Sequence, residues 1–288
     1  MQHPSWQTNS RTPATIVIGN IEIFRTIKRH TILKRYGIIG KPLGHSFSEK
    51  YFTEKFASEA IDAIYRPYPI ETIAEVKSVL QALDGFNVTY PYKESIIPYL
   101  HNIDPIAREI GAVNVVASGK GYNSDWIGFR DSLTSWDAFL RIPAADHRAL
   151  LLGTGGVSKA IQYALREMGI AYTLVSRSPS STEHDKYALG THNSIIGYNQ
   201  LDASLLEAHS LIINCTPLGM SPYECDKPSI PYESLSGCHL LYDCIYNPAM
   251  TLFLQEGKKH GCHIKNGLEM LHRQADEAWQ IWSQQSNE

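Results

Sequence analysis

The sequence predicts an α/β protein with two domains, and three observations lead to that expectation. From Arg35 onward, short β-rich runs alternate with helical patterns, an order typical of parallel α/β sheets. After Pro143, a new apolar strand at Ala149–Leu152 begins a second series of strands and helices. The length of 288 residues, 43% of them hydrophobic, is enough for two ordinary domains with buried cores.

The first unit is expected to contain three strands with helices between them. The strands are expected at Tyr36–Gly40, Ala63–Arg66 and Gly85–Thr89, and the helices at Lys50–Glu59 and Ile70–Leu83. Pro91 ends the third strand, because proline has no N–H to donate to a neighbouring strand. Polar side chains just past such a strand end are expected at the edge of the sheet where ligands bind.

A helix over Trp126–Phe139 is expected to join the two units. The second unit then runs strand, glycine-rich turn, helix and strand, which is a compact βαβ arrangement. Its further elements are expected at Val157–Met168 (helix), Tyr172–Ser176, Leu211–Asn214 and Leu240–Asp243 (strands), Ser178–Asn193 (loop) and Gly267–Trp282 (helix). This last helix is amphipathic, with apolar residues at a period near 3.6, but it has no evident partner in the sequence.

The composition favours small molecules as partners rather than nucleic acid or membranes. With 26 basic and 29 acidic residues the net charge is −3, so the broad positive field that a polyanion needs is missing. No apolar run is long enough to span a bilayer. The five cysteines form no C-x-x-C pair, which favours a reducing cytoplasm, and the twelve histidines show no metal-ligand spacing. We therefore expect a cytoplasmic monomer or homodimer without a metal.

Residues 1–34 are expected to form an extension outside the folded domains. The segment has a single acidic residue, Glu22, and five basic ones. That composition also fits a transit peptide. A disordered extension, or a translation start placed too far upstream, is the simpler interpretation, so the fold is expected to begin near Arg35.

A glycine-rich turn at Gly153–Ser158 stands between a predicted strand and a predicted helix. Glycine permits the tight turn and a close approach of the backbone to a pyrophosphate, and the helix N-terminus favours negative charge. The turn residues expected to contact a dinucleotide are Gly153, Thr154, Gly155, Gly156 and Val157. The alternative is that the glycines only make a tight turn.

The end of the next strand indicates which dinucleotide is bound. NAD enzymes usually place an acid there for the ribose 2′-hydroxyl, whereas a basic residue accommodates a 2′-phosphate. Here the strand ends at Ser176 and Arg177, without an acid. The planar donor fork of Arg177 suits a phosphate dianion, so we expect NADP(H) as the cofactor, with an ordinary surface arginine as the alternative.

Three polar clusters lie in the first unit. Ser46 and Ser48 stand two residues apart, so in an extended segment both hydroxyls face one side and can donate to a carboxylate. The alternative is that Ser48 is an ordinary helix N-cap. Thr89 and Lys93 follow the third predicted strand, and Asp125 stands just before the helix that joins the units.

In this order, and ahead of a glycine-rich βαβ unit, the clusters resemble those of the shikimate dehydrogenase family. The resemblance extends from about Tyr36 to Trp282. Seven blocks carry it, at Gly85–Lys93, Gly111–Asn114, Asn123–Asp125, Gly153–Gly156, Asn214–Met220, Asp243–Pro248 and Asn266–Leu271 with Gln274. It implies NADPH-dependent reduction of 3-dehydroshikimate to shikimate, a step toward the aromatic amino acids.

The resemblance also implies a domain division and a set of site residues. Residues 35–128 with 267–288 would form the substrate-binding domain and residues 129–266 the NADP-binding domain, with the final helix packed on the former. The substrate carboxylate would be held by Ser46, Ser48 and Tyr246, the ring hydroxyls by Thr89, Asn114 and Gln274, and the cofactor additionally by Thr216, Met220 and Gly267.

By the same resemblance, Lys93 and Asp125 would flank the reacting oxygen. Hydride arrival at a carbonyl carbon leaves an alkoxide that must gain a proton. An ammonium can stabilise that charge and donate, while a nearby carboxylate keeps the ammonium oriented. The sequence leaves open which of the two transfers the proton, and a structural salt bridge is the alternative role for the pair.

One departure from the family pattern concerns the cofactor. The family's arginine is usually followed by a second basic residue, whereas Arg177 is followed by Ser178 and Pro179. Lys159 or Lys186 would have to supply the second phosphate contact. Three other functions remain open: a quinate/shikimate dehydrogenase with relaxed cofactor use, a non-catalytic relative that binds shikimate or nucleotide, and a nicotinamide enzyme of folate or tetrapyrrole metabolism.

Overall fold

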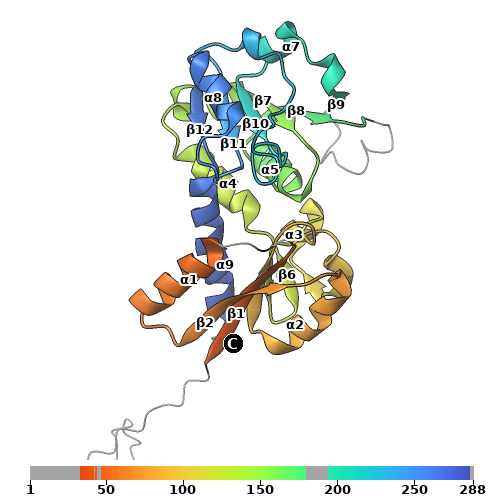
Figure 1. Cartoon of the computed structure of the whole chain (residues 1–288), viewed down its shortest axis with the longest axis vertical. Coiled ribbons are helices and arrows are strands. Elements are labelled where there is room, and N and C mark those ends of the chain that lie inside the picture. Colours follow the sequence, from red (N-terminus) through yellow and green to blue (C-terminus); the bar gives the residue numbers. More distant parts are fainter. Residues whose placement is uncertain (1–32, 42, 44–46, 180–193, 286–288) are drawn as a thin grey trace, which may run out of the picture. The chain divides into compact units, whose positions relative to one another are not determined.

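The structure, a computed structural model, describes residues 33–41, 43, 47–179 and 194–285 of the chain. The described residues from Lys34 onward form one compact unit. The described residues form two six-stranded sheets with helices around them (Figure 1). The expected extension lies outside the described residues except for its last two positions, as does most of the predicted loop Ser178–Asn193.

The first sheet has the strand order β2-β1-β3-β5-β6-β4. Its strands are β1 (Lys34–Gly40), β2 (Ala63–Pro69), β3 (Gly85–Val88), β4 (Asn102–Ile103), β5 (Val115–Ala117) and β6 (Lys120–Tyr122). The three predicted strands are confirmed as β1, β2 and β3, which are parallel to one another. β2 contains Pro67 and Pro69, and it lies at the edge of the sheet, where a missing N–H is tolerated.

The first sheet also contains strands that were not predicted, and one of them, β5, runs antiparallel to both β3 and β6. β5 and β6 form a hairpin whose two loop residues, Ser118 and Gly119, have φ angles of 47° and 76°. Positive φ at both positions is what a type I′ hairpin turn requires. The Ser-Gly dipeptide is the sequence signal for this turn, but strands of three residues are too short to show a period.

Helices α1 (Phe47–Ser58), α2 (Val76–Ala82) and α3 (Pro105–Ile110) belong to the first half of the chain. α1 begins before the predicted Lys50, because Phe47 and Tyr51 stack one turn apart with ring centroids 5.8 Å from each other. Ser48 therefore lies inside the helix, so neither the extended segment nor the N-cap expected for it is correct. The predicted helix at Ile70–Leu83 starts only after Thr72, whose N–H donates to Glu75 Oε1 at 2.9 Å.

The second sheet has the order β12-β11-β10-β7-β8-β9, and all of its pairs are parallel. Its strands are β7 (Arg148–Leu152), β8 (Ala171–Ser176), β9 (Ser194–Gly197), β10 (Leu211–Asn214), β11 (Leu240–Asp243) and β12 (His263–Lys265), and its helices are α5 (Gly156–Glu167), α7 (Ala203–Glu207) and α8 (Leu252–Lys259). Counted from β7, the strand order is 3-2-1-4-5-6, which is the Rossmann arrangement. The four predicted strands are confirmed, and the short edge strands β9 and β12 were not predicted.

Two long helices, α4 (Asp125–Thr134) and α9 (Leu268–Gln285), pack closely along one another (Figure 1). The crossing is tight at Gly128, where a Cβ would lie 2.7 Å from the carbonyl oxygen of Met270. Near its other end α9 buries Trp282, whose Nε1 donates to Val116 O of β5 at 3.0 Å. The final helix therefore covers the first sheet, as expected, although α4 is shorter than the predicted Trp126–Phe139.

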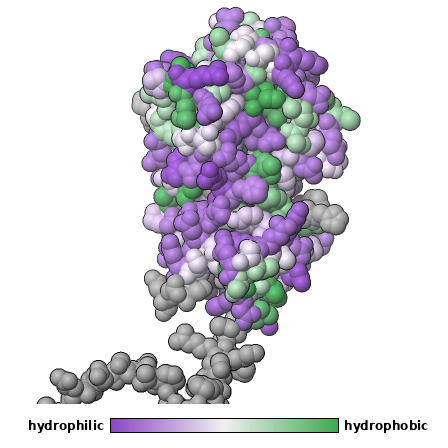
Figure 2. All heavy atoms as spheres, turned by 90° about the vertical axis from the view of Figure 1, so that its left-hand side faces the viewer, coloured by the Kyte–Doolittle hydropathy of each residue, from purple (hydrophilic) through white to green (hydrophobic). Residues whose placement is uncertain are grey.

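Apolar residues gather in separate interior clusters on the two sheets. One cluster lies around Ile39 and Phe86 of the first sheet, and others lie around Leu151 and Leu241 of the second. Figure 2 shows that the face drawn there is mainly hydrophilic, with hydrophobic side chains in small groups. Within the described part of the chain, no helix combines the length and apolarity needed to cross a bilayer.

Candidate active site

Three segments of the first sheet reach the same edge and carry predicted site residues there. β3 leads to Lys93, and β5, antiparallel to β3, begins just after Asn114. β6 pairs with β5 and ends three residues before Asp125. Backbone hydrogen bonds from Val88 N to Asn114 O (2.9 Å) and from Val113 N to Lys93 O (2.7 Å) fix these segments to one another.

Lys93 and Asp125 form an ion pair at this edge. Nζ of Lys93 lies 2.7 Å from Oδ2 of Asp125, and the side chains are 20% and 7% exposed, respectively. The other carboxylate oxygen accepts a hydrogen bond from Nδ2 of Asn114 at 2.9 Å. Asp125 is also the first residue of α4, where the helix N-terminus favours a negative charge. Both carboxylate oxygens thus face donors, and Lys93 is the more accessible member of the pair.

Asn114 connects the ion pair to helix α9. Its Oδ1 accepts from the backbone N–H of Ser124 at 2.7 Å, which fixes the orientation of the amide. Oε1 of Gln274 lies 3.4 Å from both Asn114 Nδ2 and Ser124 Oγ. The structure therefore brings Lys93, Asn114, Asp125 and Gln274 into one hydrogen-bonded group. The part played by Ser124 was not predicted, although it belongs to the Asn123–Asp125 block.

Of the two predicted serines, the structure describes Ser48, whereas Ser46 lies outside the described residues. Ser48 is buried, and its hydroxyl hydrogen-bonds that of Tyr65, which donates to Asn87 Oδ1 at 2.8 Å. Full burial raises the pKa of Tyr65, so its hydroxyl stays protonated. No sequence motif indicated Tyr65. The only signal that could have suggested it is that a buried hydroxyl on an edge strand needs a hydrogen-bond partner. Thr89 directly follows β3 and is partly exposed.

Tyr246 comes from the second sheet, three residues beyond β11, and approaches the start of α1. Its ring centroid lies 6.1 Å from that of Phe47, which precedes Ser48. His272 of α9 packs edge-on against the same Phe47 ring at 4.7 Å. The structure thus brings Tyr246 close to the start of α1, which carries Ser48.

The glycine-rich turn has the geometry that a pyrophosphate requires. Gly153 has a φ of 106°, a conformation that L side chains rarely adopt, and a Cβ there would lie 3.0 Å from Thr216 Cγ2. At Gly155 a Cβ would meet nothing within 4 Å, so the space in front of α5 is open. Gly155 is the N-cap of α5 and provides no side-chain acceptor for the first N–H groups of the helix. This open helix N-terminus fits a dinucleotide phosphate.

The strand order of the second sheet reverses between β7 and β10, the point at which sheets of this kind bind ligands. Thr216 follows β10, and its N–H and hydroxyl both donate to Asn214 Oδ1, at 3.0 and 2.7 Å. Gly267 packs so tightly that a Cβ would collide with the carbonyl oxygen of Cys244. The Met220 side chain is exposed.

A buried carboxylate that was not predicted holds the ends of β10 and β11 together. Asp243 accepts from Asn214 Nδ2 (3.1 Å), Ile245 N (3.0 Å) and Thr251 Oγ1 (2.6 Å). Burial raises the pKa of Asp243 to about 6, against the opposing effect of these three donors. Because Asn214 also accepts hydrogen bonds from Thr216, Asp243 supports the loop that follows β10.

The glycine turn and the ion pair lie next to each other. A Cβ at Gly156 would lie 3.4 Å from Cβ of Lys93 and 3.6 Å from its Cδ. The two groups of predicted residues, assigned to substrate and to cofactor, therefore meet at Lys93.

The basic residues considered for a 2′-phosphate lie in different places. Ser176 ends β8, and the next residue, Arg177, is exposed beyond the strand. Lys159 points elsewhere, because its Nζ lies 2.7 Å from Oε2 of Glu94. Lys186 lies outside the described residues.

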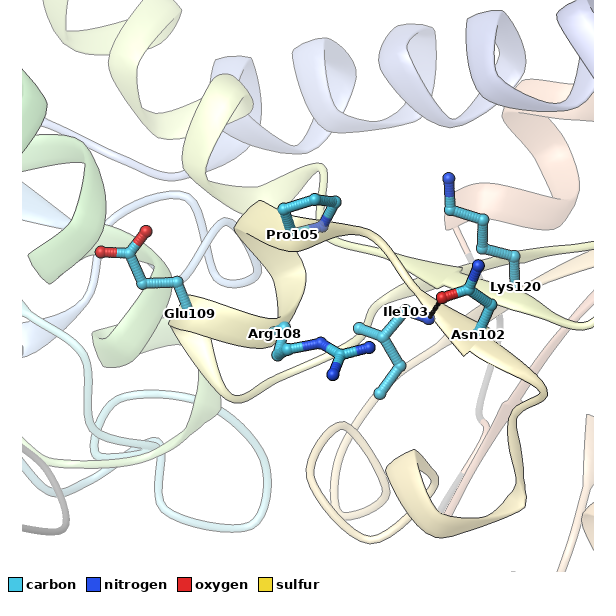
Figure 3. A pocket seen from close by; sticks show the side chains of 6 residues that line it. All are labelled: Asn102, Ile103, Pro105, Arg108, Glu109 and Lys120. Atoms are coloured by element: carbon cyan, nitrogen blue, oxygen red, sulfur yellow. Dashed lines mark hydrogen bonds between the residues drawn. The ribbon is translucent and has the colours of Figure 1, made fainter.

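Two surface hollows differ from these groups in the residues that line them. One, of about 460 Å³, lies beside β4 and α3 and is lined by Asn102, Ile103, Pro105, Arg108, Glu109 and Lys120 (Figure 3). The other, of about 520 Å³, lies at the start of α9, between Lys265 and Asp276. Neither of them is lined by a predicted site residue. The candidate site is therefore defined by the hydrogen-bonded residues around Lys93 rather than by a surface hollow.

Comparison with known proteins identifies relatives over most of the chain. The family model for the shikimate dehydrogenase substrate binding domain matches residues 38–116. Shikimate dehydrogenase (NADP(+)) of Carboxydothermus hydrogenoformans is 34% identical over 261 residues, which are 87% of this chain and 91% of the relative. The corresponding protein of Bacillus cereus strain AH187 is 36% identical over 258 residues, 86% of this chain and 92% of the relative.

A solved structure shows the same fold with both kinds of ligand. The crystal structure of shikimate 5-dehydrogenase from Thermus thermophilus, in complex with NADP(H) and shikimate, has a TM-score of 0.74 and 28% sequence identity. The match covers 87% of this chain and 93% of that one. With the two sheets, the glycine turn and the polar group around Lys93 in the places described above, the chain belongs to the shikimate dehydrogenase family.

Proposed function

We propose that the protein catalyses the reversible, NADP-dependent reduction of 3-dehydroshikimate to shikimate in aromatic amino acid biosynthesis. The observation that carries this proposal is the meeting of the Lys93–Asp125 pair with the open glycine turn, 3.4 Å from Lys93 Cβ to the Cβ position of Gly156. Relatives that share at least nine-tenths of their length with the chain bear the same activity in their names.

The cofactor would be held by the second sheet and would supply or accept the hydride. Its pyrophosphate would lie at the N-terminus of α5, over Gly155, where the backbone is open. The turn residues Thr154 and Val157 would line the same place, and Gly267 and Met220 the crevice beyond it. Arg177 would contact the 2′-phosphate from the end of β8. Since Lys159 is engaged by Glu94, Arg177 would be the main determinant of NADP over NAD.

The substrate would be held by the first sheet. Ser46 and Ser48 would bind its carboxylate together with Tyr246, and the Tyr65 hydroxyl behind Ser48 would keep that serine oriented. Thr89, Asn114 and Gln274 would bind the ring hydroxyls. Asn114 and Gln274 are already oriented by the Ser124 contacts, which reduces the entropy lost when they bind a ligand.

Lys93 would be the residue that donates the proton to the reacting oxygen. Asp125 accepts hydrogen bonds on both of its oxygens and is nearly buried, so its role would be to orient the ammonium and to balance its charge. Lys93 has one of its three N–H groups directed to Asp125, which leaves others for the substrate oxygen. In the reverse direction the neutral amine would accept the proton of the shikimate hydroxyl.

The domain division and the location follow as further parts of the proposal. Residues 35–128 and 267–288 would form the substrate domain, which is supported by the packing of α9 on β5. Residues 129–266 would form the NADP domain, which contains the whole second sheet. All five cysteines are free thiols, which supports the cytoplasm as the location.

The test is a steady-state assay that pairs shikimate and quinate with NADP and with NAD. The protein would be produced in a host without its own shikimate dehydrogenase, and an Asp125→Asn variant prepared in parallel would serve as the inactive control. We expect the highest kcat/KM for shikimate with NADP. A chain that turns over neither acid with either cofactor would refute the proposal, and preference for quinate with NAD would identify the quinate/shikimate branch of the family instead.

A further inference from the structure

The geometry points to a positioning role for the Glu94–Lys159 ion pair, which would hold Lys93 in place against the glycine-rich turn. Glu94 directly follows Lys93 in the chain, and Lys159 lies in the first part of α5, the helix that the turn begins. The inference rests on the proposed function and adds two residues for which that function names no role.

The Glu94–Lys159 contact connects the segment that carries Lys93 to the helix that begins at the glycine-rich turn. Nζ of Lys159 lies 2.7 Å from Oε2 of Glu94, and the backbone N–H of Lys159 donates to Gly155 O at 3.2 Å. Two contacts therefore link Gly155, the N-cap of α5, to Glu94, which is next to Lys93 in the chain. On the other side, Gly156 approaches Lys93 itself, so a shift of α5 against the first sheet would displace the ammonium from its place beside Asp125.

The burial of Lys159 distinguishes this pair from an ordinary surface salt bridge. Its side chain is only 9% exposed, whereas that of Glu94 is 42% exposed. Removing a buried ammonium from water is unfavourable unless an opposite charge compensates it, so the Glu94 carboxylate helps to hold Lys159 where it lies. Most exposed ion pairs, in contrast, contribute little to holding their side chains in one position.

A second ion pair on the same helix provides a matched comparison. Between α5 and the first half of the chain lies an apolar cluster that contains Ile110, Ala112, Ala160 and Tyr163. At the far end of α5 from the glycine turn, Arg166 pairs with Glu109, which Figure 3 shows pointing away from Arg108. Both pairs bridge the same two parts of the chain, but only Glu94 adjoins Lys93.

The experiment compares Glu94→Gln and Lys159→Gln with the control Glu109→Gln and with the charge-conserving Lys159→Arg. For each variant, kcat, the KM for NADP and for shikimate, and the thermal unfolding midpoint would be measured. The deuterium isotope effect on kcat would be measured with shikimate labelled at the reacting carbon.

We expect Glu94→Gln and Lys159→Gln to lower kcat by roughly 10- to 100-fold, as a small displacement of a reacting group does. Both KM values should change less than about threefold and the unfolding midpoint by less than about 4 °C, near 1 kcal/mol. The isotope effect should rise because the chemical step becomes slower than product release. Lys159→Arg should recover most of kcat, and Glu109→Gln should stay within about twofold of the wild type.

Three results would overturn the inference in different ways. An equal loss of kcat in Glu109→Gln would show that α5 docking in general, rather than this pair, is what matters. A large rise in the KM for NADP in Lys159→Gln but not in Glu94→Gln would make Lys159 a phosphate ligand. A wild-type chain without shikimate turnover would refute the proposed function, and this role with it.

Discussion

Replacing Asp125 with asparagine separates the chemistry of the site from its contribution to folding. Asp125 accepts from Lys93 through Oδ2 and from Asn114 through Oδ1, at 2.7 and 2.9 Å. Asparagine has nearly the same shape but a single acceptor oxygen, and its amide group is a donor. Whichever way it is oriented, one of the two contacts becomes donor against donor, and the negative charge beside Lys93 is lost.

The expected loss of activity is much larger than the expected loss of stability. A hydrogen bond to a charged group contributes about 1.5–3 kcal/mol, but Lys93 is 20% exposed and can be rehydrated, so we expect a net loss near 1 kcal/mol. That corresponds to a fall of about 2–4 °C in the unfolding midpoint. A positioned proton donor contributes roughly 10²- to 10⁴-fold to rate, and an unoriented Lys93 should lose most of that.

The assay follows the absorbance of the reduced nicotinamide with shikimate and NADP, together with thermal unfolding by circular dichroism. Asp131→Asn is the matched control, because Asp131 lies on the same helix, in an exposed pair with Arg130. The control should keep its activity within about twofold. If Asp125→Asn retained more than about a tenth of wild-type kcat while folding normally, the role assigned to the pair would be wrong.

Three further predictions concern the cofactor turn, a buried carboxylate and the final helix. Gly155→Ala should leave the unfolding midpoint unchanged, because the methyl group meets nothing within 4 Å, but should raise the KM for NADP roughly 10-fold by occupying the phosphate space; an unchanged KM would contradict that placement. The pKa of Asp243 is raised by burial from 3.8 to about 6, so the stabilisation linked to its protonation is fully present below pH 3.8 and is lost as the pH rises through about 6. Wild-type stability measured relative to Asp243→Asn should fall over that window and be flat above it, and a flat difference throughout would rule out the shift. Trp282→Ala should cost about 3–5 kcal/mol in chemical denaturation, because it removes a buried indole and its bond to Val116, and a loss below about 1 kcal/mol would show that α9 is not anchored there.

Strong local patterns predicted most of the fold. Apolar runs such as Leu211–Asn214 and Leu240–Asp243 coincide with β10 and β11, because a strand buried in a parallel sheet is apolar throughout. The glycine turn could be located because the positive φ at Gly153 requires glycine there, and because a glycine at position 155 leaves space for a phosphate. The antiparallel β5–β6 hairpin could not be predicted in the same way, since three-residue strands are stabilised by their neighbours rather than by their own pattern.

The family resemblance assigned Lys93, Asn114, Asp125 and Gln274 to one site, but the sequence did not show how these residues come into contact. Gln274 lies 160 residues from Asn114 in sequence, and the contact exists only because α9 packs back on α4 at Gly128.

By itself the sequence predicted the two α/β units and the glycine-rich turn, because these depend on short runs of adjacent residues, and the family resemblance added Lys93 and Asp125 as the expected reacting pair. Only the tertiary structure decided that Ser48 lies inside α1 against Tyr65, that Asp243 holds the ends of β10 and β11 together and that Lys159 pairs with Glu94. Those contacts depend on how segments distant in sequence pack against one another. A buried charge or hydroxyl is then stable only where the packing gives it a hydrogen-bond or ion-pair partner.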